Sequence, residues 1–98
     1  MRLTSYGEVV TILKKSEGFM PIILRFNGYK LFFYSNEGNP LEPPHIHVRK
    51  AGNEAKFWLE PVSLARNDGF NAKELKELLI YISTQKEVIQ GYWYDYFG

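Results

Sequence analysis

The sequence contains no cysteine, and this absence excludes several classes of site at once. Disulfide bonds, thiolate zinc sites, iron–sulfur clusters and cysteine nucleophiles all require a thiol. A small domain without such cross-links must be held together by its hydrophobic core. The 98 residues supply that core with 45% hydrophobic side chains, and 16% of the residues are aromatic.

A long apolar run and an excess of charge of one sign are also missing. No stretch of about 18 apolar residues is present, so no transmembrane helix and no membrane contact are expected. The 12 Lys and Arg and the 11 Asp and Glu give a net charge of +1, so binding to nucleic acid would require a local basic patch. The start of the chain lacks the apolar stretch of a signal peptide, which favours a cytoplasmic protein.

Helical periodicity is found at both ends of the chain. At the N-terminus it predicts a short helix that ends near Gly18. A long C-terminal helix is expected to begin at Asn71, with Glu74 three residues later as its capping-box partner, and to end near Gly91.

A first β-hairpin is indicated by the dipeptide Asn27-Gly28 between two apolar runs. A two-residue type I′ turn requires positive φ twice, and Asn-Gly tolerates this best. The resulting register places Leu24 opposite Leu31 and Ile22 opposite Phe33 on an apolar face.

A second hairpin is expected around Ala51-Gly52, although Ala is a poor residue at positive φ. A two-residue loop there defines three cross-strand pairs on one face: His45 with Trp58, His47 with Lys56, and Arg49 with Glu54.

These elements predict an α+β domain. We expect a four-stranded antiparallel meander sheet made of the two hairpins, covered by the long C-terminal helix, with a short N-terminal helix. Residues 61–70 are expected to form an irregular connection. The aromatic residues 92–97 are expected to pack on the domain.

Several strings of residues carry a resemblance to a known family. They are Met20-Pro21-Ile22-Ile23, Phe26-Asn27-Gly28-Tyr29, Glu42-Pro43-Pro44-His45-Ile46-His47-Val48-Arg49 and Trp93-Tyr94-Asp95-Tyr96-Phe97. From residue 20 to residue 98 the chain resembles the prokaryotic family catalogued as domain of unknown function 4160. The resemblance implies a single α+β domain over residues 20–98, preceded by an N-terminal helical extension over residues 1–19. Members of this family resemble parts of two-gene modules of the toxin–antitoxin type. The resemblance implies a small partner protein encoded nearby and is compatible with an RNA or DNA target.

Our leading hypothesis is a small binding or regulatory domain of such a module. It would contact the partner protein, and RNA or DNA, through a basic and aromatic sheet face. Cations on such a face meet phosphates, and bases stack on its rings. If the two hairpins share one sheet, this face collects Arg25, Lys30, Phe32, Tyr34, His45, His47, Arg49, Lys56 and Trp58.

An alternative hypothesis is a small metal-independent ribonuclease-like toxin. Such an enzyme needs an acid–base group near neutral pH and cations on the phosphate. His47 and His45 supply the imidazoles, Arg49 and Lys56 supply the cations, and Tyr34 is expected nearby.

A further alternative is a metal-binding module, because His45 and His47 have the His-x-His spacing of metal ligands on a strand. A third ligand would have to come from a carboxylate, and the nearby ones are Glu42, Glu54 and Glu60. Since Arg49 opposes Glu54 in the expected register and would repel a metal ion, we assign no metal and no cofactor.

A purely structural role for both histidines is the remaining alternative. His45 would then pack on Trp58, Phe32 would lie under a helix or the aromatic tail, and Arg49 and Glu54 would form an ordinary cross-strand ion pair.

Overall fold

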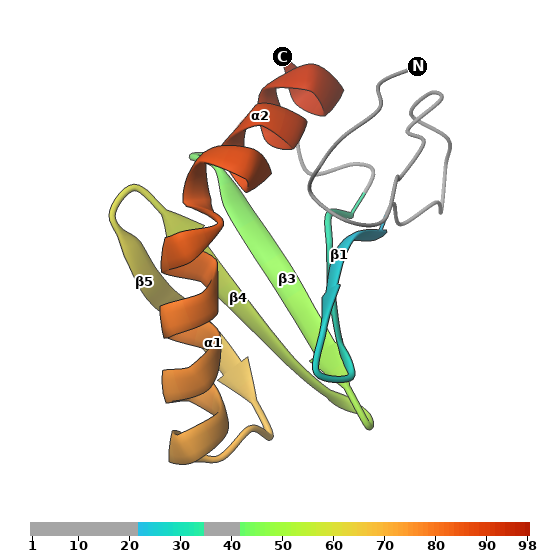
Figure 1. Cartoon of the computed structure of the whole chain (residues 1–98), viewed down its shortest axis with the longest axis vertical. Coiled ribbons are helices and arrows are strands. Elements are labelled where there is room, and N and C mark those ends of the chain that lie inside the picture. Colours follow the sequence, from blue (N-terminus) through green and yellow to red (C-terminus); the bar gives the residue numbers. More distant parts are fainter. Residues whose placement is uncertain (1–21, 35–41) are drawn as a thin grey trace.

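The computed structural model describes residues 22–34 and 42–98. Within them the chain forms β1 (Ile22–Phe26), β2 (Tyr29–Phe32), β3 (His45–Lys50), β4 (Asn53–Leu59), β5 (Val62–Asp68), α1 (Ala72–Thr84) and α2 (Lys86–Phe97). The strands form one antiparallel sheet in sequence order, and the two helices follow one another along one face of it (Figure 1). The predicted α+β class is confirmed. The helix expected over residues 1–19 lies outside the described residues.

Both predicted two-residue turns are confirmed. Asn27 and Gly28 have φ angles of 48° and 85°, as a type I′ turn requires. Ala51 and Gly52 have nearly the same angles, 52° and 85°. Ala51 therefore adopts the left-handed conformation in spite of its Cβ. This was the less certain of the two turn predictions, because alanine is a poor residue at positive φ.

The register is confirmed in the second hairpin and is wrong at the open end of the first. Ile22 pairs with Phe32 rather than with Phe33, because the register shifts between Ile22 and Leu24. This β-bulge inserts one extra residue, Ile23. Both Ile23 and Phe33 are thereby fully buried, at 0% exposure. Burial of two large apolar side chains favours the bulge over a regular ladder.

The predicted number of strands is wrong. Residues 62–68, expected to be irregular, form β5, which pairs antiparallel with β4. The run Asn67-Asp68-Gly69 is typical of a turn by composition, but at the edge of a sheet Asp68 is exposed and the Asn67 side chain hydrogen-bonds the backbone of Phe70. The pairing shifts between Lys56 and Phe57, so Ala65 is an extra residue in the edge strand.

The predicted start of the C-terminal helix is confirmed. The backbone N–H of Glu74 donates to the side-chain oxygen of Asn71 at 2.8 Å. The backbone N–H of Asn71 donates in return to the carboxylate of Glu74 at 3.0 Å. This reciprocal pair is a capping box and satisfies two backbone donors at the helix N-terminus.

The single long helix is wrong, because α1 ends at Thr84 and α2 begins after Gln85. The hydroxyls of Ser83 and Thr84 donate to the carbonyls of Leu79 and Tyr81, in competition with the backbone ladder. The second helix then runs through residue 91, the expected end, and includes residues 92–97. These aromatic residues pack on the domain as expected, with Tyr92, Trp93 and Tyr96 buried.

The hydrophobic core lies between the helices and one face of the sheet. Its fully buried members come from every strand from β1 to β4 and from both helices, and include Ile23, Leu31, Phe33, Ile46, Val48, Phe57, Leu59, Leu78, Ile82 and Ile89. In the described part of the chain, no helix is long and apolar enough to cross a membrane. Since the core occupies one face of the sheet, polar side chains that could bind a ligand are to be sought on the opposite face.

Candidate functional site

Cross-strand pairing places three cations and one carboxylate in a row on the sheet face opposite the core. Arg25 pairs with Lys30, and Lys30 pairs with Arg49. Arg49 in turn pairs with Glu54. Arg25 and Lys30 are exposed, and the Arg49 side chain is 42% exposed. We call Arg25, Lys30 and Arg49 the cation row, and it leads across β1, β2 and β3 to Glu54 on β4.

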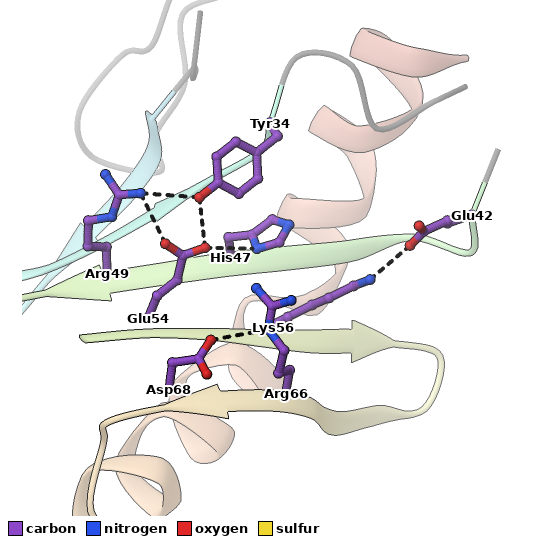
Figure 2. Close-up of polar contacts among 8 residues, drawn as sticks. All are labelled: Tyr34, Glu42, His47, Arg49, Glu54, Lys56, Arg66 and Asp68. Carbon is purple, nitrogen blue, oxygen red and sulfur yellow. Dashed lines mark hydrogen bonds and ion pairs between the residues drawn. The ribbon is translucent and has the colours of Figure 1, made fainter. Parts of the chain in front are cut away.

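Four polar side chains converge at the end of this row (Figure 2). The Tyr34 hydroxyl donates to Glu54 Oε2 at 2.8 Å. One guanidinium nitrogen of Arg49 donates to Glu54 Oε1 at 3.0 Å and to the Tyr34 hydroxyl at 3.1 Å. His47 Nδ1 lies 3.6 Å from Glu54 Oε2. We call Tyr34, His47, Arg49 and Glu54 the Glu54 cluster, because every member contacts this carboxylate.

The surroundings of the cluster change the proton affinities of two members. Burial raises the pKa of Tyr34, and its hydrogen bond to Glu54 raises it further. The hydrogen bond to Glu54 also raises the pKa of Arg49. Tyr34 therefore holds its proton at neutral pH and can donate it. Arg49 stays cationic beside the carboxylate and can stabilise negative charge on a bound group.

The members of the Glu54 cluster differ in their access to solvent. The Glu54 side chain is 17% exposed, and Tyr34 is half-buried. His47 is 3% exposed, since its ring stacks on Phe32 and meets the edge of Tyr34. A bound molecule can thus reach Glu54, Arg49 and Tyr34, whereas His47 is accessible only through its contact with Glu54.

Comparison with known proteins gives one match. The model of a family described as a domain of unknown function, DUF4160, matches residues 28–94. The chain belongs to the DUF4160 family. The expected resemblance is confirmed, and the matched residues include the whole Glu54 cluster. No curated protein and no solved structure matches the chain.

Of the four residues predicted from the sequence to be catalytic, only two lie together in this DUF4160 domain. His47 and Arg49 meet at Glu54, but Lys56 turns away and donates to Glu42 at 2.8 Å (Figure 2). His45 is completely buried, at 0% exposure. A residue without exposed surface cannot touch a substrate in this conformation, so His45 does not belong with the reactive groups.

His45 instead holds the start of β3 against its surroundings. Its ring meets those of Trp58 at 5.7 Å and Trp93 at 4.8 Å between centroids. Its Nδ1 lies 3.0 Å from the carbonyl oxygen of Pro43. The contact with Trp58 was expected under the structural alternative. Together with the contact with Trp93, it links β3, β4 and α2 around one imidazole.

The aromatic members of the predicted nucleic-acid face are less open than its cations. Phe32 is 2% exposed, so its ring is not available to a nucleobase. Trp58 is half-buried, and the Lys56 ammonium lies 4.5 Å from its ring centroid. The Tyr34 hydroxyl is hydrogen-bonded to Glu54 and Arg49. The DUF4160 sheet face therefore offers mainly charge and hydrogen bonds, rather than a row of rings for stacking.

Sequence reasoning placed Tyr34 near the candidate residues but missed the central position of Glu54 among them. The register predicted that Arg49 faces Glu54, and this pair is confirmed. It did not predict that the same carboxylate reaches diagonally to His47 and across to Tyr34, which lies beyond the end of β2. The signal available in the sequence was a glutamate that faces Arg49 across the hairpin and lies diagonally opposite His47.

The metal alternative lacks a complete set of ligands in the ranges 22–34 and 42–98. No group of three or more His, Cys, Asp or Glu in these ranges lies together in a way that could hold a metal ion. His45 and His47 each approach a different carboxylate, Glu42 and Glu54 respectively. The two imidazoles thus belong to separate polar contacts.

Proposed function

We propose that this DUF4160 domain cleaves single-stranded RNA at the Glu54 cluster. One observation carries the proposal. A carboxylate reachable from solvent accepts hydrogen bonds from a tyrosine and an arginine, and a row of cations leads to it across the sheet. Phosphodiester cleavage needs this combination: a proton acceptor, a proton donor and a fixed positive charge on the phosphate.

The proposed reaction is an intramolecular transfer within the RNA. Glu54 removes the proton of a 2′-hydroxyl, and the 2′-oxygen attacks the adjacent phosphorus. The bond between phosphorus and the 5′-oxygen of the next nucleotide breaks, and Tyr34 donates its proton to that oxygen. Protonated Glu54 then returns a proton to Tyr34 across their 2.8 Å hydrogen bond, so the balance closes. The products are a 2′,3′-cyclic phosphate and a 5′-hydroxyl.

Arg49 would stabilise the transition state, in which negative charge accumulates on the phosphate oxygens. Its guanidinium is held by Glu54 and Tyr34 and is still 42% exposed. A preformed donor of this kind needs no reorganisation when the charge develops. His47 would orient Glu54 from behind rather than touch the RNA, which makes it a positioning residue.

The exposed cations Arg25 and Lys30 would bind the phosphates that flank the cleaved bond. This keeps the basic sheet face of our leading hypothesis and gives it a purpose. A ribonuclease in a two-gene module requires a partner that blocks it. The small partner protein would do so by covering the cation row.

The test measures cleavage of a fluorescently labelled single-stranded RNA by the purified domain, with the DNA of the same sequence beside it. We expect the RNA to be cut to cyclic-phosphate and 5′-hydroxyl ends and the DNA to stay intact, because DNA lacks the attacking 2′-hydroxyl. Arg25, Lys30 and Arg49 would each contact one phosphate. A plot of the logarithm of the binding constant against the logarithm of the salt concentration should therefore have a slope of about −2.

The decisive variant is Glu54→Gln, which retains the shape and an acceptor oxygen but takes up no proton. We expect it to lower the cleavage rate by at least about 100-fold while the salt-dependent binding persists. The matched control is Asp68→Asn, because Asp68 pairs with Glu54 across β4 and β5 but contacts only Arg66 among the residues drawn in Figure 2. Intact RNA in the presence of the unmodified domain, or full activity in Glu54→Gln, would contradict the proposal.

A further inference from the structure

A groove of about 550 Å³ lies outside the Glu54 cluster, where the segment that enters β3 meets the last turn of α2. Its walls are residues 42–44 on one side and Trp93, Tyr94 and Phe97 on the other. Its volume is within the range of roughly 300–1,000 Å³ typical of small-molecule sites. The Tyr94 ring in this wall is 55% exposed and therefore accessible to a bound molecule.

One carboxylate provides the charge of this groove. Glu42 is 42% exposed, and within the described residues it contacts Lys56 Nζ at 2.8 Å and His45 Nδ1 at 3.7 Å, both through Oε1. Neither contact involves Oε2. Because a carboxylate offers about four lone-pair sites, Glu42 can accept further hydrogen bonds from a molecule in the groove.

The groove and the Glu54 cluster are joined by single side chains. Lys56 opposes His47 across β3 and β4 and extends to Glu42 (Figure 2). His45 contacts the ring of His47 at 5.2 Å on one side and that of Trp93 at 4.8 Å on the other. Lys56 and His45 therefore connect the groove to the Glu54 cluster. A nucleotide whose phosphate lies at the cluster has the groove as a neighbouring site for its base.

We propose that this groove binds a guanine base of the RNA and gives the domain its sequence preference, an inference that rests on the proposed function. Stacking on Tyr94 and Phe97 would accept any base. Glu42 would discriminate, because the Watson–Crick edge of guanine presents two adjacent N–H donors, N1–H and N2–H₂, to the two oxygens of a carboxylate. Adenine, cytosine and uracil each have a single donor group next to an acceptor on this edge, so one carboxylate oxygen would face an acceptor.

The test uses mononucleotides, so that it does not depend on cleavage. Guanosine 3′-monophosphate is titrated into the full chain, and the indole N–H signal of Trp93 is followed by NMR. The 3′-monophosphates of adenosine, cytidine and uridine are titrated in the same way. We expect guanosine 3′-monophosphate to bind at least about 10-fold more tightly than the other three, a ratio typical of one well-placed pair of hydrogen bonds. Equal affinity for all four nucleotides, or an unchanged Trp93 signal, would overturn the guanine site.

Two variants separate the two parts of the groove. Glu42→Gln presents one N–H₂ donor toward the guanine donors, so the preference for guanosine 3′-monophosphate is expected to disappear while weak binding of all four nucleotides persists. Tyr94→Ala is expected to weaken all four to a similar extent. Glu87→Gln, an exposed carboxylate in the first turn of α2, is the matched control and should bind like the unmodified chain. Retention of the full preference in Glu42→Gln would contradict the role of Glu42.

The same design distinguishes this inference from the proposed function. Selective binding of guanosine 3′-monophosphate without cleavage of any RNA would support the groove and contradict the ribonuclease. Cleavage of RNA without preference for guanine, together with equal binding of the nucleotides, would support the ribonuclease and contradict the groove.

Discussion

His47 is a buried side chain that would support the proposed reaction without touching the RNA. The ring centroids of Phe32 and Tyr34 lie 5.6 Å and 4.6 Å from that of His47, and Nδ1 lies 3.6 Å from the Glu54 carboxylate. Only 3% of the residue is exposed. In the proposed reaction its contribution would therefore be the position of Glu54, and a displacement of about 1 Å in a reacting group can lower a rate by about 100-fold.

Replacement of His47 should consequently affect turnover and leave substrate binding unchanged. If the proposed reaction holds, we expect His47→Leu to lower kcat by about 10- to 100-fold at constant KM, because the proposed RNA contacts of Arg25 and Lys30 are unchanged. His47→Gln, which restores a polar partner for Glu54, should recover part of the loss. Steady-state kinetics with a short RNA, together with a thermal unfolding curve for each variant, measure this split. A rise in KM with unchanged kcat would instead assign His47 to RNA binding.

At the scale of elements, the two hairpin turns form a natural comparison. Both begin with a residue near φ 50°, which is Asn27 in the first turn and Ala51 in the second, and both continue with glycine at φ 85°. Alanine in this conformation is strained, and asparagine tolerates it. We expect Ala51→Asn to raise the free energy of unfolding by up to about 1 kcal/mol, measured by urea denaturation.

The reverse change in the first turn provides the control. Asn27→Ala should lower the free energy of unfolding by more than Ala51→Asn raises it. The reason is that Asn27 also donates a hydrogen bond of 2.9 Å to Glu77 on α1. Equal and opposite effects would show that this hydrogen bond contributes little, and a destabilised Ala51→Asn would mean that turn strain is not what distinguishes the hairpins.

Local chemistry explains which elements could be predicted from the sequence. The turns at Asn27 and Ala51 and the capping box at Asn71 each depend on residues within a few positions of one another, and all three are confirmed. The edge strand β5 could not be recognised, because its polar residues are tolerated only by their place in the sheet. The break at Gln85 depends on which carbonyls the neighbouring hydroxyls reach, and helical periodicity does not report this.

The candidate site divides in the same way. The pair of Arg49 with Glu54 follows from the hairpin register and was predicted. The contacts of Glu54 with Tyr34 and His47 depend on side-chain direction and on the path of the chain beyond β2, which no sequence pattern specifies. For the same reason Lys56 was assigned to the reactive groups, whereas in the structure it binds Glu42.

At the scale of the whole molecule, the tip of the first hairpin docks on α1. The rings of Phe26 and Tyr81 stack at 3.8 Å between centroids, and the hydroxyl of Tyr29 donates to Glu77 at 3.2 Å. These contacts join the β1–β2 end of the sheet to the helical layer. Both helices of the described residues, α1 and α2, lie on this side of the sheet, away from the cation row and Glu54 (Figure 1).

Tyr29 makes this docking sensitive to alkaline pH. Burial raises the pKa of its hydroxyl from 10.0 to about 12, and the charge of Glu77 adds to the effect. Between these two values the unfolded chain loses the phenolic proton and the folded chain retains it. The stability present below pH 10 is therefore lost as the pH rises toward 12, by about 2 to 3 kcal/mol for this one group.

The prediction is read from urea unfolding of the protein and of Tyr29→Phe across that pH interval. At neutral pH the variant should be slightly the less stable of the two, because it lacks the hydrogen bond to Glu77. Above pH 10 the difference should shrink and then reverse, because phenylalanine has no proton to lose. Tyr94→Phe, at an aromatic ring that is 55% exposed, is the control and should follow the unmodified protein. Parallel stability curves for the protein and Tyr29→Phe up to pH 12 would mean that the buried hydroxyl of Tyr29 does not couple the docking of the hairpin on α1 to pH.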